Sequence, residues 1–384
     1  MNARQIAKVA SSYGADDVRF MDAALQYGRR NMGMAAPNPS VGAIVVKTSG
    51  AAPVIIARGV TAKGGRPHAE TEALKIAGEA AKGATVYVTL EPCAHQSKTP
   101  PCANALIQAQ AGRVVIAIED PNPLVSGNGI RMLRDAGIET IVGIGAAQAK
   151  IDHAGHFRRV RDGRPHIILK LAVSADGKTG LVGRKPARIS GPVSMAEAHI
   201  LRATSDAIMV GSGTVLADNP KLDCRLPGME DRSPIRVVLD GSLRIPLDSA
   251  LVQTAKARKL IVIASENAPA ETQKALEEKG AEVIRVQSTK DRWRKPVIAD
   301  AMAELGKRGI TRLLVEGGPM LSASLLQNDL VDEAVVVRAP VMLGGSAIDA
   351  LEGLPLDALL ASPKLAIIEE RVLGEDHMVR LFRK

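Results

Sequence analysis

A chain of 384 residues is long enough for two domains that each bury a core of their own. Hydrophobic residues make up 46% and charged residues 24%, which excludes a disordered or fibrous chain. A formal net charge of +9 favours anionic ligands. However, three Phe, three Tyr and one Trp leave little for stacking on unpaired bases. The expected ligands are therefore small phosphorylated molecules, and we expect no nucleic acid or membrane partner.

The cysteine count and the N-terminal residues bear on the cellular compartment. Three cysteines are few and odd in number, which favours a reducing environment. Residues 1–14 contain no long apolar core, so we expect no signal peptide. We therefore expect a cytoplasmic protein.

The first half of the chain alternates helix-like and strand-like segments. The spacing of apolar residues and the helix-ending signals predict helices over 18–31, 68–81, 101–111 and 129–136. Short β-branched runs predict strands over 41–47, 54–60, 85–90, 113–119 and 138–144. Strands that alternate with helices in this way indicate an α/β sheet with helices packed on its faces.

A polar stretch from His153 to Pro165 ends this first unit, and we place the domain boundary near residue 163. The second half opens on a strand over 166–174 and repeats the pattern. Further strands are predicted over 207–210, 235–239, 260–264, 282–286, 312–315, 333–338 and 378–382, with helices over 194–203, 270–279 and 297–307. The sequence therefore predicts two α/β domains, residues 1–163 and 164–384.

The most specific chemistry lies between residues 68 and 102. His68 opens a predicted helix, Cys93 follows a predicted strand, and Cys102 begins the next helix. Zinc takes imidazole and thiolate ligands, and three protein ligands leave the fourth position open for water, as in catalytic zinc sites. A helix N-terminus, such as the one predicted at Cys102, favours the thiolate form of a cysteine. The sequence therefore predicts an open zinc site.

Glu70 stands two residues after His68, close enough to reach a water molecule on such a metal. A carboxylate there can take a proton from the water and deliver it to a leaving amine. His-x-Glu followed by Pro-Cys is typical of zinc deaminases that act on nucleobase rings, although the second cysteine here comes nine residues after the first. Two alternatives stay open: the cysteines are inert buried thiols, or the zinc is structural and His95 is its fourth ligand.

Five stretches of the first half together resemble the bifunctional riboflavin-biosynthesis deaminase–reductase family. They are APNPSVG (36–42), HAE (68–70), YVTLEPCAH (87–95), TPPC (99–102) and DPNPLVSG (120–127). The resemblance implies a cytidine-deaminase-like three-layer domain that removes an exocyclic amine from a phosphoribosylated diaminopyrimidinone. The resemblance implies that Glu70 is the catalytic residue and that the zinc ligands are His68, Cys93 and Cys102.

The resemblance continues in the second half over 169–177, 201–203, 210–220, 237–240 and 315–319. It implies a dihydrofolate-reductase-like domain that uses NADPH to reduce the ribosyl group to ribityl. The cofactor-binding residues that it implies are Ala172, Arg188, Thr214, Asp218, Gly241, Gly318, Pro319, Met320, Leu321, Ser322, Ala323 and Ser324. The substrate-binding residues that it implies, over both halves, are Asn38, Lys170, Pro186, Arg202, Leu222, Arg225 and Glu316.

Several of these residues suit their roles on chemical grounds. The Glu-Gly-Gly-Pro segment at 316–319 follows a strand and opens a helix, so its backbone N–H groups could meet a pyrophosphate. It is not the G-x-G-x-x-G pattern of a Rossmann domain. Arg202 and Arg225 suit a substrate phosphate, although surface salt bridges are the alternative for each. Asn38 lies on a Pro-Asn-Pro loop that could aim its amide at the pyrimidine, or it is a simple turn former.

We therefore expect a two-step enzyme that uses Zn²⁺ and NADPH on a phosphorylated pyrimidine, and the resemblance implies a homo-oligomer, either a dimer or a tetramer. Two alternatives come from other classes of protein. One is a zinc deaminase of another nucleobase class whose C-terminal domain presents nucleic acid, against which the low aromatic content counts. The other is a structural zinc module that binds a protein partner, which has no reason to keep Glu70 beside a ligand histidine.

Overall fold

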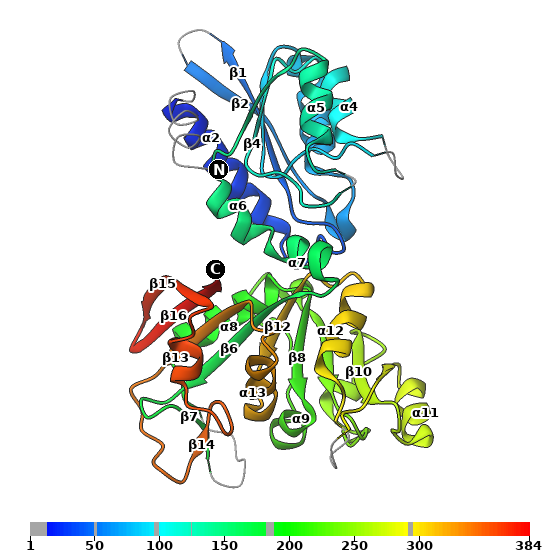
Figure 1. Cartoon of the computed structure of the whole chain (residues 1–384), viewed down its shortest axis with the longest axis vertical. Helices are drawn as coiled ribbons and strands as arrows, with labels where there is room; N and C mark the ends of the chain where they lie inside the picture. The colour runs from blue at the N-terminus through cyan, green and yellow to red at the C-terminus, as the bar shows by residue number, and fades with distance from the viewer. Residues whose placement is uncertain (1–13, 50–51, 96–99, 124, 182–187, 291–294) are drawn as a thin grey trace. The chain divides into compact units, whose positions relative to one another are not determined.

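The computed structural model describes residues 14–49, 52–95, 100–123, 125–181, 188–290 and 295–384, and these form two compact units (Figure 1). Unit 1 ends at Gly163 and unit 2 begins at Arg164. Gly163 has a φ of 68°, which glycine adopts without a Cβ clash, and the last helix of unit 1 ends there. No helix in the described ranges is both long and apolar enough to cross a membrane.

Unit 1 is built on a five-stranded sheet with the order β2-β1-β3-β4-β5, in which β3, β4 and β5 run parallel and β1 is antiparallel to both of its neighbours. Its strands are β1 (Gly42–Ser49), β2 (Ala52–Val60), β3 (Thr85–Val88), β4 (Arg113–Ile116) and β5 (Glu139–Val142). Its helices are α2 (Ala15–Gly28), α3 (Ala69–Ala77), α4 (Cys102–Gln108), α5 (Asn128–Asp135), α6 (Ala146–Asp152) and α7 (Ala154–Asp162).

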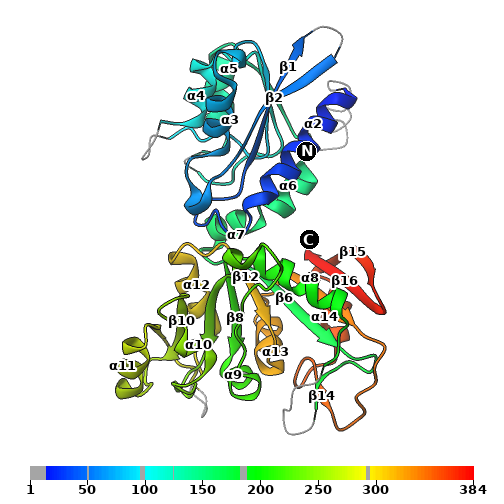
Figure 2. The same ribbon diagram turned by 180° about the vertical axis from the view of Figure 1, so that it is seen from behind.

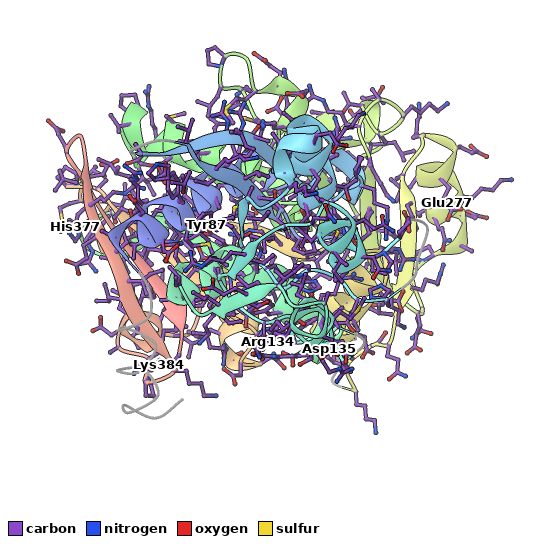
Figure 3. All side chains as sticks on the ribbon, turned by 90° about the horizontal axis from the view of Figure 1, so that it is seen from above. Tyr87, Arg134, Asp135, Glu277, His377 and Lys384 are labelled. Carbon is purple, nitrogen blue, oxygen red and sulfur yellow. The ribbon has the colours of Figure 1, made fainter. Side chains whose placement is uncertain are left out.

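Helices cover both faces of this sheet, which gives unit 1 three layers (Figure 2). Side chains alternate along β1. Ala43 and Val45 join the core shared with α3, α4 and α5, whereas Ile44 and Val46 join the core shared with α2 and α6. The outer side of α5 is polar: Arg134 and Asp135, which are labelled in Figure 3, are both exposed.

Unit 2 is built on a nine-stranded sheet with the order β11-β10-β9-β8-β12-β6-β13-β16-β15. Its neighbouring strands run parallel, except that β16 is antiparallel to both β13 and β15. Its strands are β6 (His166–Val173), β8 (Ala207–Gly211), β9 (Ile235–Leu239), β10 (Leu260–Ser265), β11 (Glu282–Val286), β12 (Arg312–Glu316), β13 (Glu333–Arg338), β15 (Leu365–Leu373) and β16 (Asp376–Arg383). Two short strands, β7 (Lys178–Gly180) and β14 (Ile348–Asp349), pair separately.

Helices again lie on both faces of the large sheet (Figure 1). They are α8 (Pro192–Ala203), α9 (Ser212–Asp218), α10 (Ala250–Gln253), α11 (Ala270–Glu278), α12 (Ile298–Lys307) and α13 (Pro319–Gln327), and a short α14 spans Asp357–Leu360. Ile167 and Leu169 of β6 face the core shared with α12 and α13, and Ile168 faces the one shared with α8 to α11. Glu277 lies on the solvent side of α11 (Figure 3).

The predicted α/β architecture is confirmed in both units, and β9, β11 and β13 have the predicted bounds. The polar stretch that ends unit 1 is not a plain connection, because residues 154–162 form α7. Its buried residues are Ala154, Gly155, His156 and Phe157, none of which has a large aliphatic side chain, so the apolar periodicity of a helix is weak there. The sequence also gives no prediction for β15, where Glu369, Glu370 and Arg371 interrupt the apolar pattern.

We propose that the two units fold independently, since each contains its own buried cores on both faces of its own sheet. Fragments 1–163 and 164–384 should each unfold in a single cooperative transition. Circular dichroism melts of the two separate fragments check this. If neither fragment melts cooperatively, the two halves depend on each other and the boundary at residue 163 is misplaced.

Candidate active sites

Three potential metal ligands come together in unit 1 from three different elements. His68 is the N-cap of α3, Cys93 lies in the loop after β3, and Cys102 is the first residue of α4. The His68 Nδ1 atom lies 3.3 Å from the Cys102 Sγ atom and 3.7 Å from the Cys93 Sγ atom. All three ligand atoms lie within 4.8 Å of one another.

These separations fit a tetrahedral zinc site. Zn–S bonds of about 2.3 Å and Zn–N bonds of about 2.0–2.1 Å place neighbouring ligand atoms about 3.6 Å apart. Among the described residues, His95 is not part of the cluster. In the part of the chain that the structure describes, the arrangement therefore offers three potential ligands, which fits an open site better than a structural site with four protein ligands.

The three groups are electrostatically coupled. A hydrogen bond from the Cys102 thiol, aided by His68, lowers the pKa of Cys93 to about 4 although burial opposes this. The same bond to Cys93 raises the pKa of Cys102, and the contact with Cys93 raises the pKa of His68. The backbone N–H of Cys102 also donates to the Cys93 sulfur at 3.3 Å. One thiolate is thus already stabilised at Cys93, as a zinc ligand requires.

Glu70 lies in the first turn of α3, and its side chain is buried. This burial raises the pKa of Glu70 to about 7, although the nearby His68 works in the opposite direction. A carboxyl group whose pKa lies near neutrality can both accept and release a proton at working pH. Glu70 is therefore suited to carry a proton next to the metal ligands.

Asn38 lies beside the predicted metal ligands. Its Nδ2 atom donates to the Gly65 carbonyl oxygen at 2.8 Å and lies 3.3 Å from His68 Nε2. Gly65 has a φ of 89°, and a Cβ there would lie 3.0 Å from the Asn38 side chain. The glycine thus lets Asn38 pack closely, and the half-buried amide lies next to the ring of His68.

In unit 2, charged residues gather near the carboxyl ends of β6 and β12. Lys170 and Glu316 are register partners on these two parallel strands. Arg202 of α8 donates from Nε and Nη2 to the two Glu316 oxygens at 2.7 and 2.6 Å. Burial would raise the pKa of Glu316, but Arg202 holds it below its ordinary value. Burial lowers the pKa of Lys170, and Glu316 offsets part of that effect.

Arg225, the second arginine that the sequence predicts to bind the substrate phosphate, lies in the segment after α9. Arg225 donates from Nη1 to Asp223 Oδ1 at 2.7 Å, and its side chain is 52% exposed. Leu222 is buried in the same segment and has a φ of 52°. Arg202 Nη1 donates to the Asp223 carbonyl oxygen at 3.0 Å, so Asp223 connects the two arginines. The sequence does not single out Asp223, because only the fold brings it to Arg202.

Several of the predicted cofactor residues lie at the edge of the sheet where β8, β9 and β12 end. Gly317 and Gly318 follow β12 with φ values of 83° and 82°, which favour glycine, and Pro319 opens α13. An ideal Cβ on Gly318 would lie 3.5 Å from the Thr214 hydroxyl oxygen of α9. This turn therefore brings two glycines, a threonine and a helix N-terminus together, which suits the phosphates of a dinucleotide.

The other predicted cofactor residues have more varied surroundings. Gly241 follows β9, and a Cβ there would lie 2.8 Å from Pro296 Cδ. Ala172 lies on β6, and its carbonyl oxygen accepts a hydrogen bond from Thr179. Asp218 and Arg188 are exposed. Pro186 lies outside the described residues. Met320 to Ser324 form the first turns of α13, with Leu321, Ser322 and Ala323 buried.

Comparison with known proteins defines the class first. Residues 15–118 match the cytidine and deoxycytidylate deaminase zinc-binding region, and residues 165–379 match the RibD C-terminal domain. The zinc-binding match contains the part of unit 1 that carries His68, Cys93 and Cys102. The chain thus joins a zinc-binding deaminase domain to a reductase domain.

The particular family follows from full-length relatives. The riboflavin biosynthesis protein RibD of Aquifex aeolicus (strain VF5) is 37% identical, over 94% of this chain and 97% of the relative. The protein of the same name from Escherichia coli (strain K12) is also 37% identical, over 95% and 99%. The chain belongs to the RibD family, whose members combine a deaminase and a reductase of riboflavin biosynthesis.

Solved structures agree over the full length. Acinetobacter baumannii RibD, form 1, is similar with a TM-score of 0.83 and 34% identity, covering 96% of this chain and 99% of the other. A Thermotoga maritima diaminohydroxyphosphoribosylaminopyrimidine deaminase/5-amino-6-(5-phosphoribosylamino)uracil reductase is similar with a TM-score of 0.81 and 30% identity, at the same coverage. The alternative of a C-terminal domain that presents nucleic acid is set aside, because unit 2 matches the RibD C-terminal domain.

Proposed function

We propose that unit 1 deaminates 2,5-diamino-6-(5-phosphoribosylamino)pyrimidin-4-one and that unit 2 then reduces the ribosyl group of the product to ribityl with NADPH. The observation that carries the proposal is the cluster of His68, Cys93 and Cys102 with the buried carboxyl group of Glu70 beside it. The name of the similar Thermotoga maritima protein, which states a deaminase and a reductase activity, supports this choice of substrate. The family membership of the chain supports Zn²⁺ and NADPH as its cofactors.

In the first step, His68 Nδ1 and the two sulfur atoms would hold zinc, which when bound lowers the pKa of a water molecule and supplies a nucleophile at neutral pH. Glu70 accepts a proton from the attacking water and donates it to the departing amine, so that ammonia leaves. Asn38 lies against His68, where its amide oxygen can orient the pyrimidine ring. Burial of Glu70 keeps bulk water from competing for its proton.

In the second step, NADPH when bound supplies a hydride to the ribosyl C1′. The Gly317-Gly318 turn and the first turn of α13 would hold its phosphates, and Thr214 lies next to that turn. Lys170, Arg202 and Glu316 form a charged cluster, and this cluster would lie next to the ribosyl group of a bound substrate. Arg225 is the arginine whose guanidinium is exposed enough to meet the substrate phosphate, while Arg202 fixes the Glu316 carboxylate.

The reductase should prefer NADPH over NADH by about 10–100-fold in kcat/KM. The physical reason is one charge-assisted contact to the 2′-phosphate, worth about 1.5–3 kcal/mol at 1.4 kcal/mol per factor of ten. Steady-state kinetics with deaminated substrate and each cofactor measure the preference. Equal kcat/KM values for the two cofactors would refute it.

The variant Arg225→Ala, measured in the same assay, distinguishes the binding site of the substrate phosphate from that of NADPH. It should raise the KM of the phosphorylated substrate and leave the KM of NADPH nearly unchanged, because we assign this guanidinium to the substrate phosphate. Arg188→Ala serves as the matched arginine variant on the cofactor side. If Arg225→Ala weakened NADPH and spared the substrate, the two pockets would be reversed.

We also propose a cytoplasmic location and a homo-oligomeric state. The two cysteines of the metal cluster must stay reduced to bind zinc, which suits a reducing compartment. Light scattering on the purified chain distinguishes a dimer or tetramer from a monomer.

A further inference from the structure

Glu91, two residues before Cys93, makes an unusual set of hydrogen bonds. Its side chain is buried, and each of its oxygens accepts two backbone N–H groups. Oε1 accepts from Gly129 at 3.0 Å and from Ile130 at 3.3 Å. Oε2 accepts from Gly127 at 3.1 Å and from Asp120 at 3.2 Å. One carboxylate thus satisfies four buried or partly buried donors that would otherwise each lack a partner.

These four donors span the 120–127 motif and the start of α5. The N-cap of α5 is Gly127, which has no side chain that could cap the helix, so Glu91 caps it from another part of the chain. A negative charge at a helix N-terminus is also favourable. The proposed catalysis gives the 120–127 motif no role of its own, and its backbone is bound to the segment that carries a metal ligand.

Helix α5 packs tightly against the backbone of residues 91–93. A Cβ on Gly129 would lie 2.0 Å from the Pro92 carbonyl oxygen, so the helix rests directly on the backbone between Glu91 and Cys93. On the far side of the motif, Asp120 lies 3.0 Å from His156 Nε2 of α7. The motif is therefore anchored at both ends.

Cys93 itself is held from the other direction by α4. The Cys102 N–H donates to the Cys93 sulfur at 3.3 Å, and the Ala103 N–H donates to the Cys93 carbonyl oxygen at 3.2 Å. The segment from Glu91 to Cys93 thus lies between the N-termini of two helices, α4 and α5. Its position sets where the Cys93 sulfur stands relative to His68 Nδ1.

We propose that Glu91 is a positioning residue for the metal centre: by binding four backbone N–H groups it fixes the Cys93 sulfur in ligand geometry. These groups belong to Asp120, Gly127, Gly129 and Ile130. The four hydrogen bonds of the Glu91 carboxylate go to backbone N–H groups and none goes to His68, Cys93 or Cys102, so it acts through Pro92 and Cys93. The inference rests on the zinc role proposed above.

Glutamine at position 91 tests this directly, because it keeps the size of the side chain. Its amide offers one oxygen to two of the N–H groups and turns an NH₂ group toward the other two, where donor meets donor. The 120–130 segment and Cys93 should then shift or loosen while the cores of unit 1 stay intact. Glu79→Gln is the matched control, since Glu79 is exposed on the 3₁₀ turn after α3.

The experiment uses the full chain, stripped of metal and titrated with zinc against a chromophoric chelator. Glu91→Gln should raise the zinc dissociation constant by about 10–100-fold, the range found for outer partners of metal ligands. Cobalt(II) loaded in place of zinc should show altered thiolate-to-metal and ligand-field absorption. At saturating zinc, the kcat of deamination should fall by a larger factor than its KM rises. The reductase activity should be unchanged. Glu79→Gln should match the wild type in each measurement.

Three results would overturn the inference. Wild-type zinc affinity and a wild-type cobalt spectrum in Glu91→Gln would leave the carboxylate with no role at the metal, even if the melting temperature fell. Loss of the calorimetric transition of unit 1 would assign Glu91 to the stability of the whole unit instead. If the wild-type chain itself bound no zinc, the proposed function would fail as well, and only that outcome removes both.

Discussion

Glu70→Gln should retain a full complement of zinc and lose deaminase activity by at least about 10²-fold, the low end for general acid–base catalysis. The amide has the shape of the carboxyl group but cannot accept the proton of the attacking water. Its burial next to the metal ligands means that bulk water cannot easily replace it. Ammonia release by the purified variant, alongside metal analysis of the same sample, gives both readouts.

The reductase half provides the internal control for this variant. Reduction of deaminated substrate by NADPH should proceed at the wild-type rate, because Glu70 belongs to unit 1 and the reductase residues belong to unit 2. Glu72→Gln on the same helix is a matched control outside the cluster. Deamination by Glu70→Gln at the wild-type rate would falsify the assignment of the proton carrier.

Cys93→Ser and Cys102→Ser should each lose nearly all zinc. A serine hydroxyl does not give up its proton near neutral pH as a thiol does, and zinc binding requires deprotonated ligands. The three potential ligand atoms lie within 4.8 Å of one another, so the loss of either sulfur leaves an incomplete ligand set. Metal analysis after dialysis measures the loss, and deamination should fall with it.

Cys224→Ser supplies the control for the cysteine variants. Cys224 is buried in unit 2, where its thiol lies 3.6 Å from the His199 carbonyl oxygen, and it is not part of the metal cluster. This variant should keep its zinc. Full zinc occupancy in both Cys93→Ser and Cys102→Ser would remove these residues from the ligand set.

The order of helices and strands could be predicted where local pattern and burial agree. β9 and β13 lie inside the sheet, and each contains a run of β-branched residues that indicates a strand, although β9 contains Arg236 and β13 begins and ends with a charged residue. β15 could not be predicted in this way, because it is an edge strand whose pairing with β16 outweighs its charged sequence. Helix α7 escaped prediction because it buries imidazole and phenyl rings in place of aliphatic side chains.

The cluster of His68, Cys93 and Cys102 could be predicted from the sequence because its residues lie at the ends of predicted elements in one short stretch. Interactions between distant segments could not be predicted in this way. The bidentate pair of Arg202 with Glu316 joins residues 114 positions apart, and Asp223 meets Arg202 only through the fold. Glu91 is another such case, since its four partners lie 29 to 39 positions further along the chain. No local pattern marks a carboxylate that caps a helix from elsewhere.

A coupled assay on the purified full-length chain tests the central claim most directly. The chain is supplied with 2,5-diamino-6-(5-phosphoribosylamino)pyrimidin-4-one and NADPH, and both ammonia release and the loss of NADPH absorbance are followed. We predict that ammonia appears first, and that NADPH is then oxidised until one equivalent has been consumed for each ammonia released. NADPH oxidation without ammonia release, or no reaction of either kind with zinc-loaded protein, would contradict the assignment of two successive activities to this chain.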